Sequence, residues 1–403
     1  MNSDSEPNPQ NPNDPQDNES SGTPSNRREF LRGISAIDAI RGNLENANSG
    51  PSLDDKNVAI SQNRQSGYLE YYSKNAMACE FEIFFNLHQY RHSGIATMEA
   101  FQLIDLLEDQ LTIYRDHSEL TQINQTAFGK VVSVEQRLFD LLSLAQTLFL
   151  ETAGAFDITA GPLTRLWGFE KRKGNLPTQS QIDSILPSIG SDHIELRKRD
   201  STIRFTSSNL KLNLGGIGKG HALDRVKELF AERELENYIV HGGQSSVIAN
   251  GNSADLETTI PSSTAISPNK PTTSQFGWTV GISHPTLPGH RVAEVYLRNQ
   301  ALGTSGTARQ GFYHQGKRYG HIIDPRTGWP ADQYLSTTVI SPSAAISDAL
   351  ATAFFVMPLE SIQSYCDDHP EISTILIADH PNDRGRFTIE TFNLADDAWN
   401  QLT

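Results

Sequence analysis

Four strand-like segments follow one another between residues 238 and 297, with no helical segment between them. They span residues 238–240, 245–249, 278–282 and 293–297, and they are separated by glycines or polar residues. A doubly wound parallel sheet needs a helix after each strand, whereas successive strands can pair directly as antiparallel neighbours. The order of these segments therefore predicts an α+β fold with a mixed, largely antiparallel sheet.

The rest of the chain mixes helical and strand periodicities without regular alternation. Helices are predicted at residues 97–114, 134–152, 218–233 and 344–355. Further strands are predicted at residues 80–85, 212–214, 336–340, 374–378 and 387–391. We expect these helices to flank the sheet.

Polar composition is concentrated in two parts of this 403-residue chain. Residues 1–26 contain almost no apolar side chains, and residues 27–65 offer at most a short helix. A segment that cannot bury apolar surface is expected to be disordered, so we predict a disordered N-terminal tail over residues 1–65. Residues 66–403 then form one domain, which carries a polar surface insertion at residues 252–275.

The net charge of −15 argues against nucleic acid as a partner, because a basic footprint is absent. A site for an anionic nucleotide would need a metal ion or local positive charge. No apolar run approaches the roughly 20 residues of a membrane-spanning helix, so we expect no transmembrane segment. The two cysteines, Cys79 and Cys366, are far apart in the sequence and are expected to be free thiols.

Residues 26–32 resemble a twin-arginine export signature around Arg27 and Arg28. An export signal also needs an apolar stretch of about 7–15 residues, but residues 33–41 contain Asp38 and Arg41. A short amphipathic helix or a docking segment explains the same residues. No early cysteine offers a lipid attachment site, so the sequence favours a cytoplasmic location.

The region from Thr304 to Thr352 concentrates side chains suited to catalysis. It begins with a predicted turn of small hydroxyl residues, Thr304-Ser305-Gly306, and continues with His321 and its neighbours. Asp348 and Thr352 are four residues apart, so both oxygens point from one face of a helix. A carboxylate and a hydroxyl are hard ligands suited to Mg²⁺, which could help to hold a phosphate.

Each of these residues has a structural interpretation as well. His321 could be a general base, or it could be a hydrogen-bonded structural histidine. Asp348 could cap a helix, but Ala344–Ser347 place it inside the helix, where a carboxylate among apolar residues needs a partner.

Two further motifs point to nucleotide binding. A glycine loop at residues 212–220 leads into a helix, and its backbone and Lys219 could approach a phosphate, although a tight packing turn explains it equally well. The second motif, residues 154–157, contains Phe156 and Asp157. Phe156 and Trp167 could flank a flat ring that Asp157 hydrogen-bonds, or they could simply belong to the core.

Taken together, these segments resemble the FAD:protein FMN transferase family, also called ApbE-like, over roughly residues 70–400. Five separated motifs occur in the family's order: residues 114–124 with Tyr114 and Ser118-Glu119-Leu120, residues 154–157, residues 214–220, residues 304–306, and residues 321–328 with Asp348 and Thr352. The resemblance implies an ApbE-like, T-fold-related fold. It also implies an Mg²⁺-dependent enzyme that transfers the FMN part of FAD to a Thr or Ser hydroxyl of a recipient protein and releases AMP.

The resemblance also assigns roles by position. It implies contacts with FAD for Met77, Tyr114, Ala155, Phe156, Asp157, Asn213, Lys219 and Ile322. It implies that Mg²⁺ is held by the Gly216 carbonyl, Asp348 and Thr352, and that His321 is the base. The chain departs from the family at Gln244, at Thr307-Ala308 and at Asn213, where many members carry other residues.

Two other functions fit the same residues. An Mg²⁺-dependent FAD pyrophosphatase would use water in place of the hydroxyl and release FMN and AMP. A flavin-binding carrier protein would bind without turnover.

Overall fold

The computed structural model describes residues 69–170, 173–253, 277–307, 311–383 and 385–402. Its centre is an eight-stranded sheet in which every neighbouring pair is antiparallel. The strands, in spatial order, are β1 (Leu69–Ala76), β2 (Cys79–Asn86), β6 (Tyr238–Gly242), β7 (Ser246–Asn250), β10 (Gln300–Gly306), β13 (Ser336–Ser341), β14 (Ser373–Asp379) and β15 (Phe387–Phe392). The predicted antiparallel α+β architecture is confirmed.

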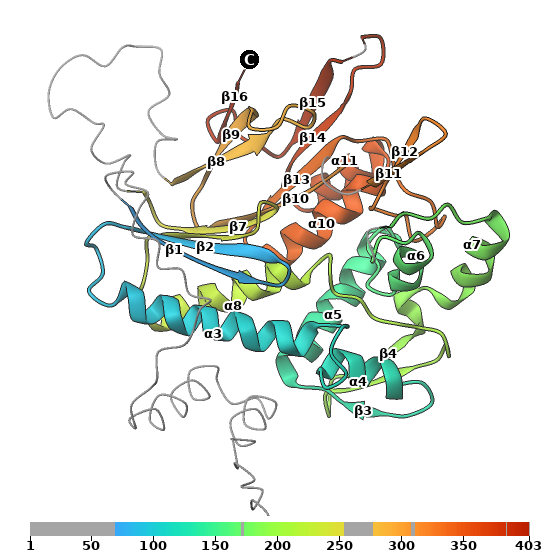
Figure 1. Ribbon diagram of the computed structural model, residues 1–403. Helices are drawn as coiled ribbons and strands as arrows, with labels where there is room; N and C mark the ends of the chain where they lie inside the picture. The colour runs from blue at the N-terminus through green and yellow to red at the C-terminus, as the bar shows by residue number, and fades with distance from the viewer. Residues whose placement is uncertain (1–68, 171–172, 254–276, 308–310, 384, 403) are drawn as a thin grey trace, which may run out of the picture.

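Helices cover one face of this sheet (Figure 1). They are α3 (Ser93–Leu111), α8 (Gly218–Glu232) and α10 (Ala344–Val356), and the largest cluster of buried apolar residues lies between them and the strands. The apolar residues of α10 include Phe354 and Phe355, which are fully buried. This burial fixes α10 against the sheet, as the helical spacing predicted.

A smaller antiparallel sheet covers part of the opposite face. Its strands, in spatial order, are β16 (Trp399–Gln401), β9 (Arg291–Leu297) and β8 (Trp278–Ser283). Trp278, Val280 and Ile282 point from β8 toward the large sheet and pack against residues such as Val247 and Leu302. The large sheet is therefore buried on both faces, although the cover on this side is partial.

The remaining elements lie beside the sheet. α4 (Glu119–Thr126), α5 (Gln136–Glu151) and a sheet of β3 (Val132–Ser133), β5 (Thr202–Phe205) and β4 (Ile194–Arg197) form one group. A second group comprises α6 (Gly161–Leu166), α7 (Gln179–Ile185) and the hairpin of β11 (Gly311–His314) and β12 (Lys317–Gly320), packed around Trp167. α11 (Leu359–Asp368) follows α10, and short 3₁₀ turns span Leu186–Ser188 and Ser191–His193.

Glycines allow α10 to approach its neighbours closely. A Cβ on Gly220 of α8 would lie 2.1 Å from the Ala344 carbonyl oxygen, and a Cβ on Gly303 of β10 would lie 2.4 Å from the Ser347 carbonyl oxygen. Both contacts exclude any larger residue. They hold the helix that carries Asp348 against the glycine loop on one side and β10 on the other.

Two local predictions are wrong. Residues 212–214 are irregular rather than a strand, because Asn124 binds the Leu212 backbone through its side chain and no strand pairs there. Thr304-Ser305-Gly306 ends strand β10 rather than forming a turn, because β10 pairs with β13 from Ala301 to Gly306. Strand β1 was not predicted.

The described residues contain no helix long and apolar enough to cross a membrane. Cys79 and Cys366 are both free, as expected. The predicted tail at residues 1–65 lies outside the described residues, as does the predicted insertion apart from Asn252 and Ser253.

Candidate active site

A cavity of about 1300 Å³ opens where β6, β7 and β10 end beside α8 and α10. It brings together ten of the residues to which the sequence assigned a role. They are Ala155, Phe156, Asp157, Asn213, Gly216, Lys219, His321, Ile322, Asp348 and Thr352. These residues come from three of the five separated motifs and from Asn213 beside one of them, so the fold gathers side chains that lie almost 200 residues apart in the sequence.

Asp348 lies in the second turn of α10 and is only 6% exposed. Its Oδ1 accepts a hydrogen bond from the Ser246 hydroxyl at 2.5 Å, and its Oδ2 accepts one from the Gly220 backbone N–H at 2.8 Å. The Lys219 ammonium lies 3.8 Å from Oδ2. The carboxylate is thus charge-compensated and held in one orientation, which a buried anion requires.

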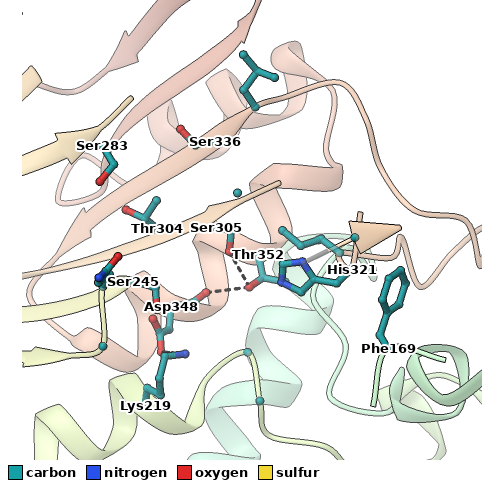
Figure 2. A pocket seen from close by; sticks show the side chains of 18 of the residues that line it. Phe169, Lys219, Ser245, Ser283, Thr304, Ser305, His321, Ser336, Asp348 and Thr352 are labelled. Carbon is teal, nitrogen blue, oxygen red and sulfur yellow. Dashed lines mark hydrogen bonds and ion pairs between the residues drawn. The ribbon is translucent and has the colours of Figure 1, made fainter. Parts of the chain in front are cut away.

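Thr352 lies one turn further along the same face of α10. Its Oγ1 donates to the Asp348 carbonyl oxygen at 3.2 Å and lies 3.2 Å from Ser305 Oγ of β10. Gly216 is close to Thr352, since a Cβ on it would lie 3.5 Å from Thr352 Oγ1. Figure 2 shows Ser305, Thr352 and Asp348 linked in this way at one wall of the pocket.

Side chains shape the glycine loop that precedes α8. Asn213 Oδ1 accepts the Gly215 N–H at 2.9 Å, and the Asn124 side chain both donates to the Leu212 carbonyl and accepts the Leu212 N–H. The N-cap residue Ile217 makes no side-chain cap, and in the first turn of α8 the Gly220 N–H donates to Asp348 Oδ2 instead. The start of a helix carries partial positive charge, and with Lys219 it creates a favourable place for a phosphate in an otherwise acidic protein.

The segment Ala155–Asp157 forms the facing wall. Ala155 and Phe156 are buried, and the Phe156 ring packs beside Gly216. Asp157 Oδ1 accepts three hydrogen bonds, from the Thr159 N–H, the Thr159 hydroxyl and the Ser191 hydroxyl. Burial raises the pKa of Asp157, and these three hydrogen bonds oppose that rise.

His321 directly follows β12, and its ring is directed into the pocket in Figure 2. The following residue, Ile322, is buried, and its carbonyl accepts a hydrogen bond from the Ala331 N–H at 3.0 Å. Asp324 faces Arg326 in a two-bond ion pair with both N···O distances at 2.8 Å. The hydrogen bond to Asp324 raises the pKa of Arg326, so the guanidinium keeps its charge in this pair.

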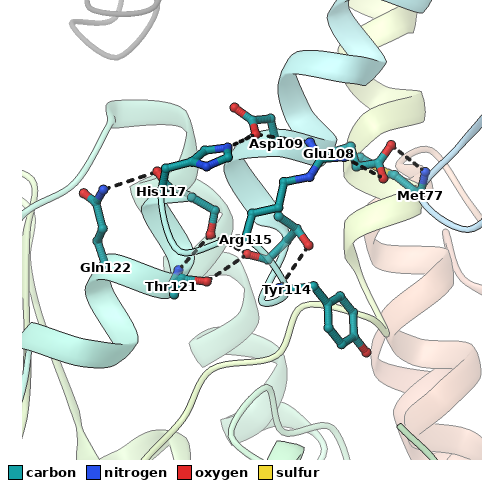
Figure 3. A network of polar contacts seen from close by, with 10 residues as sticks. Met77, Glu108, Asp109, Tyr114, Arg115, His117, Thr121 and Gln122 are labelled. Atoms are coloured by element: carbon teal, nitrogen blue, oxygen red, sulfur yellow. Dashed lines mark hydrogen bonds and ion pairs between the residues drawn. The ribbon is translucent and has the colours of Figure 1, made fainter. Parts of the chain in front are cut away.

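Met77 and Tyr114 are not among the residues that line the cavity. Figure 3 shows them near the end of α3, where the Met77 backbone N–H donates to Glu108 at 3.0 Å. Tyr114 is 76% exposed, and its backbone N–H donates to Thr112 Oγ1 at 3.2 Å.

The structure decides between the two interpretations of Trp167 and adds Ser246 to the site. Trp167 is fully buried and donates from Nε1 to the Gly328 carbonyl, so it belongs to the core. Ser246 was missed as a site residue although it contacts Asp348 directly. A hydroxyl residue in the buried strand β7 was the available signal, because a polar group there needs a partner.

The donor set fits a hard divalent cation. Asp348, Thr352 and Gly216 offer carboxylate, hydroxyl and carbonyl oxygens within one small region. No three His, Cys, Asp or Glu side chains gather into a metal site in the described part of the chain, and Asp348 is the acidic member of this donor set. Such a set with few protein ligands is typical of Mg²⁺ shared with a phosphate.

Comparison with known proteins places these features in a family context. A family model described as "ApbE family" matches residues 77–376. The FAD:protein FMN transferase of Haemophilus influenzae is 32% identical over 256 residues, which cover 62% of this chain and 68% of the relative. The FAD:protein FMN transferase of Vibrio cholerae is 30% identical over 282 residues, which cover 68% of this chain and 78% of the relative.

Solved structures agree with the fold. The flavin transferase ApbE from Vibrio cholerae superposes with a TM-score of 0.67 at 26% identity, covering 80% of this chain and 97% of that chain. The ApbE protein of Thermotoga maritima superposes with a TM-score of 0.66 at 24% identity, covering 80% of this chain and 96% of that one. The ApbE-like α+β fold expected from the sequence is confirmed.

Proposed function

Because this chain belongs to the ApbE family, we propose that it transfers the FMN part of FAD to a Thr or Ser hydroxyl of a recipient protein. The observation that carries this proposal is the arrangement of Asp348, Thr352, Lys219 and His321 around one cavity. That cavity offers a cation site, a positive side chain for a phosphate and a titratable ring within the reach of one substrate. The names of the similar proteins support the same reaction.

The reaction is a phosphoryl-group substitution at the FMN-side phosphorus of FAD. A bond forms between the recipient hydroxyl oxygen and this phosphorus, while the bond from phosphorus to the bridging oxygen breaks and AMP leaves with that oxygen. The hydroxyl proton passes to the His321 ring, which acts as general base. Lys219 and the start of α8 lie where negative charge on the pyrophosphate would be balanced.

Mg²⁺ would be held by Asp348, Thr352 and the Gly216 carbonyl. When bound, it neutralises the pyrophosphate and makes the phosphorus easier to attack. Ser246 and Gly220 keep the Asp348 carboxylate turned toward this place through their hydrogen bonds. Such outer contacts commonly tune metal affinity.

FAD would lie between the glycine loop and the facing wall. Phe156 offers an aromatic face, Asp157 and Asn213 offer hydrogen-bonding groups, and Ile322 offers apolar contact. Met77 and Tyr114 are proposed contacts for the flavin end of the molecule, which would then extend beyond the cavity toward the end of α3. The exposed Tyr114 ring is available for such a contact.

The deciding experiment is incubation of the protein with FAD, Mg²⁺ and candidate recipient proteins, followed by intact-mass analysis. A recipient that gains the mass of FMN, with stoichiometric release of AMP, supports the proposal. Release of free FMN and AMP without any labelled protein would identify a pyrophosphatase. Binding of FAD without AMP release under all conditions would identify a carrier protein.

A further inference from the structure

The cavity continues around the end of β10 onto the opposite face of the large sheet. Consecutive strand residues point to opposite faces. Ser305 contacts Thr352 on the helix side, whereas Thr304 Oγ1 lies 2.9 Å from Thr338 Oγ1 on the other side. Both residues line the cavity, and Figure 2 shows Thr304 on the far side of β10 from Asp348.

The far part of the cavity holds none of the proposed FAD or metal residues. Its floor includes Val247, Leu302, Thr304 and Ser336, which lie on the sheet face that β8 and β9 partly cover. His241 of β6 lies on the same face, opposite Val247. This far part is therefore open to a second substrate while FAD occupies the helix side.

Strand β8 forms the side wall of this far part. All five residues from Thr279 to Ser283 line the cavity, although their side chains alternate between two faces. A cavity that runs along the edge of a strand meets consecutive residues in this way. In the described part of the chain, β8 pairs with β9 alone, so its other edge faces the cavity.

The hydrogen-bonding pattern shows which backbone groups that edge presents. Thr279 lies opposite Tyr296, and Gly281 lies opposite Glu294. The Tyr296 N–H donates to the Ala398 carbonyl, away from β8, so the pair with Thr279 is not hydrogen-bonded across the two strands. By the same alternation, the N–H and C=O groups of Thr279 and Gly281 point toward the cavity.

We propose that an extended segment of the recipient protein binds along β8 as an added strand. Its backbone would pair with Thr279 and Gly281, and every second side chain would face the floor formed by Leu302, Thr304 and Ser336. The segment would carry its acceptor hydroxyl past the end of β10 to the helix side, where His321 and Asp348 lie. This inference rests on the proposed transferase function, because it supplies the docking site for the second substrate.

The test uses two variants at one position. Thr279→Pro removes the N–H that points toward the cavity while leaving the bonds to β9 intact, because proline is tolerated at such edge positions. Thr279→Val keeps that N–H and the branched shape. The probe is a pool of synthetic peptides that each carry one threonine between randomised residues, with FMN addition measured by mass spectrometry.

Thr279→Pro should label peptides with a kcat/KM about tenfold lower than Thr279→Val, as expected for loss of a backbone hydrogen bond that positions the peptide. The two variants should bind FAD with equal affinity, because the residue lies outside the proposed FAD contacts. Equal labelling by both variants would contradict the docking site.

A second measurement keeps the test decisive if Thr279→Pro fails to fold. Peptides that the natural protein labels are resynthesised with single N-methyl groups at successive positions. Labelling should fall at alternate positions only, because only every second residue of an added strand pairs with β8. An equal loss of labelling at every N-methylated position would contradict strand pairing. If the natural protein labels neither peptides nor proteins, the transferase function itself is contradicted.

Discussion

His321 is the residue whose proposed role can be separated most clearly from binding. As a base it acts on the acceptor hydroxyl rather than on FAD. His321→Asn keeps a polar side chain but removes the titrating ring, so the transfer rate should fall by about two to four orders of magnitude while FAD affinity changes little. The measurements are single-turnover transfer at saturating FAD and FAD binding by fluorescence.

The opposite pattern would mean that His321 binds FAD or supports the fold. Asp324, three residues after His321, would then be the first candidate for the base, but its carboxylate is held in a two-bond ion pair with Arg326. Arg326 also donates to the Val356 carbonyl, which ties this pair to the end of α10. We therefore interpret Asp324 as a structural residue of the loop that carries His321.

Ser246 gives a second prediction at this scale, which concerns the metal rather than the base. Ser246→Ala removes the hydroxyl that holds Asp348 Oδ1, so affinity for Mn²⁺, used as a spectroscopic substitute for Mg²⁺, should fall about 10- to 100-fold. Electron paramagnetic resonance measures free Mn²⁺ directly, without turnover. Ser245→Ala is the matched control, because its hydroxyl lies 3.4 Å from Ser246 Oγ, whereas the hydrogen bond to Asp348 comes from Ser246. Equal Mn²⁺ affinity in the two variants would remove Ser246 from the metal site.

Among the elements, α10 depends on a residue of another helix. Asp224 of α8 accepts hydrogen bonds from the Ala344 and Ala345 N–H groups at 2.8 and 2.9 Å and from the Ser343 hydroxyl at 2.7 Å. This carboxylate caps the start of α10 from outside the helix. Asp224→Ala should lower the free energy of unfolding by about 1–2 kcal/mol, as measured in urea.

The same substitution should also weaken Mn²⁺ binding, because α10 carries both Asp348 and Thr352. Asp140→Ala on the exposed side of α5 is a suitable control, since its carboxylate accepts a hydrogen bond from Gln136, one turn away on the same helix. A variant that loses stability but binds Mn²⁺ with the natural affinity would show that Asp224 stabilises the fold without positioning the metal ligands.

Elements with strong periodicity could be predicted, whereas those defined by contacts could not. The pattern of α10 and of β6 through β9 identified them correctly, because apolar spacing reflects a buried face directly. Strand β10 was not predicted. Its small residues, Gly303 among them, are required by the close approach of α10 and do not have the high strand propensity that a sequence pattern reveals. Asp348 and Thr352 were paired from helical spacing alone, but Ser246 lies 102 positions away and could be connected to them only in three dimensions.

For the whole molecule, two histidines couple stability to pH. Burial lowers the pKa of both His221 and His241 to about 4 from the ordinary value of 6.5, and Arg137 adds to the effect at His221. Above pH 6.5 both are neutral in the folded and unfolded chains. Between pH 6.5 and about 4 the unfolded chain binds protons that the folded chain does not, so these histidines destabilise the fold as pH falls.

Carboxylates with raised pKa act in the opposite direction. Burial raises the pKa of Glu119, Asp157, Asp224 and Glu228, so the folded chain takes up their protons first as pH falls. The pH dependence of the unfolding free energy is therefore a sum of opposing contributions. Its sign does not identify the contribution of any one group. A comparison of the natural protein with one variant removes the shared contributions.

His241→Asn is that variant, because it removes one histidine contribution and leaves the carboxylates in place. The loss of unfolding free energy between pH 7 and pH 5 should be smaller in the variant than in the natural protein by about 2 kcal/mol, the difference expected for a pKa that moves from 6.5 to about 4. Urea unfolding at the two pH values measures both differences. If the loss is the same in both proteins, His241 is protonated in the folded state near its ordinary pKa, and the cavity floor beside it is open to water rather than shielded.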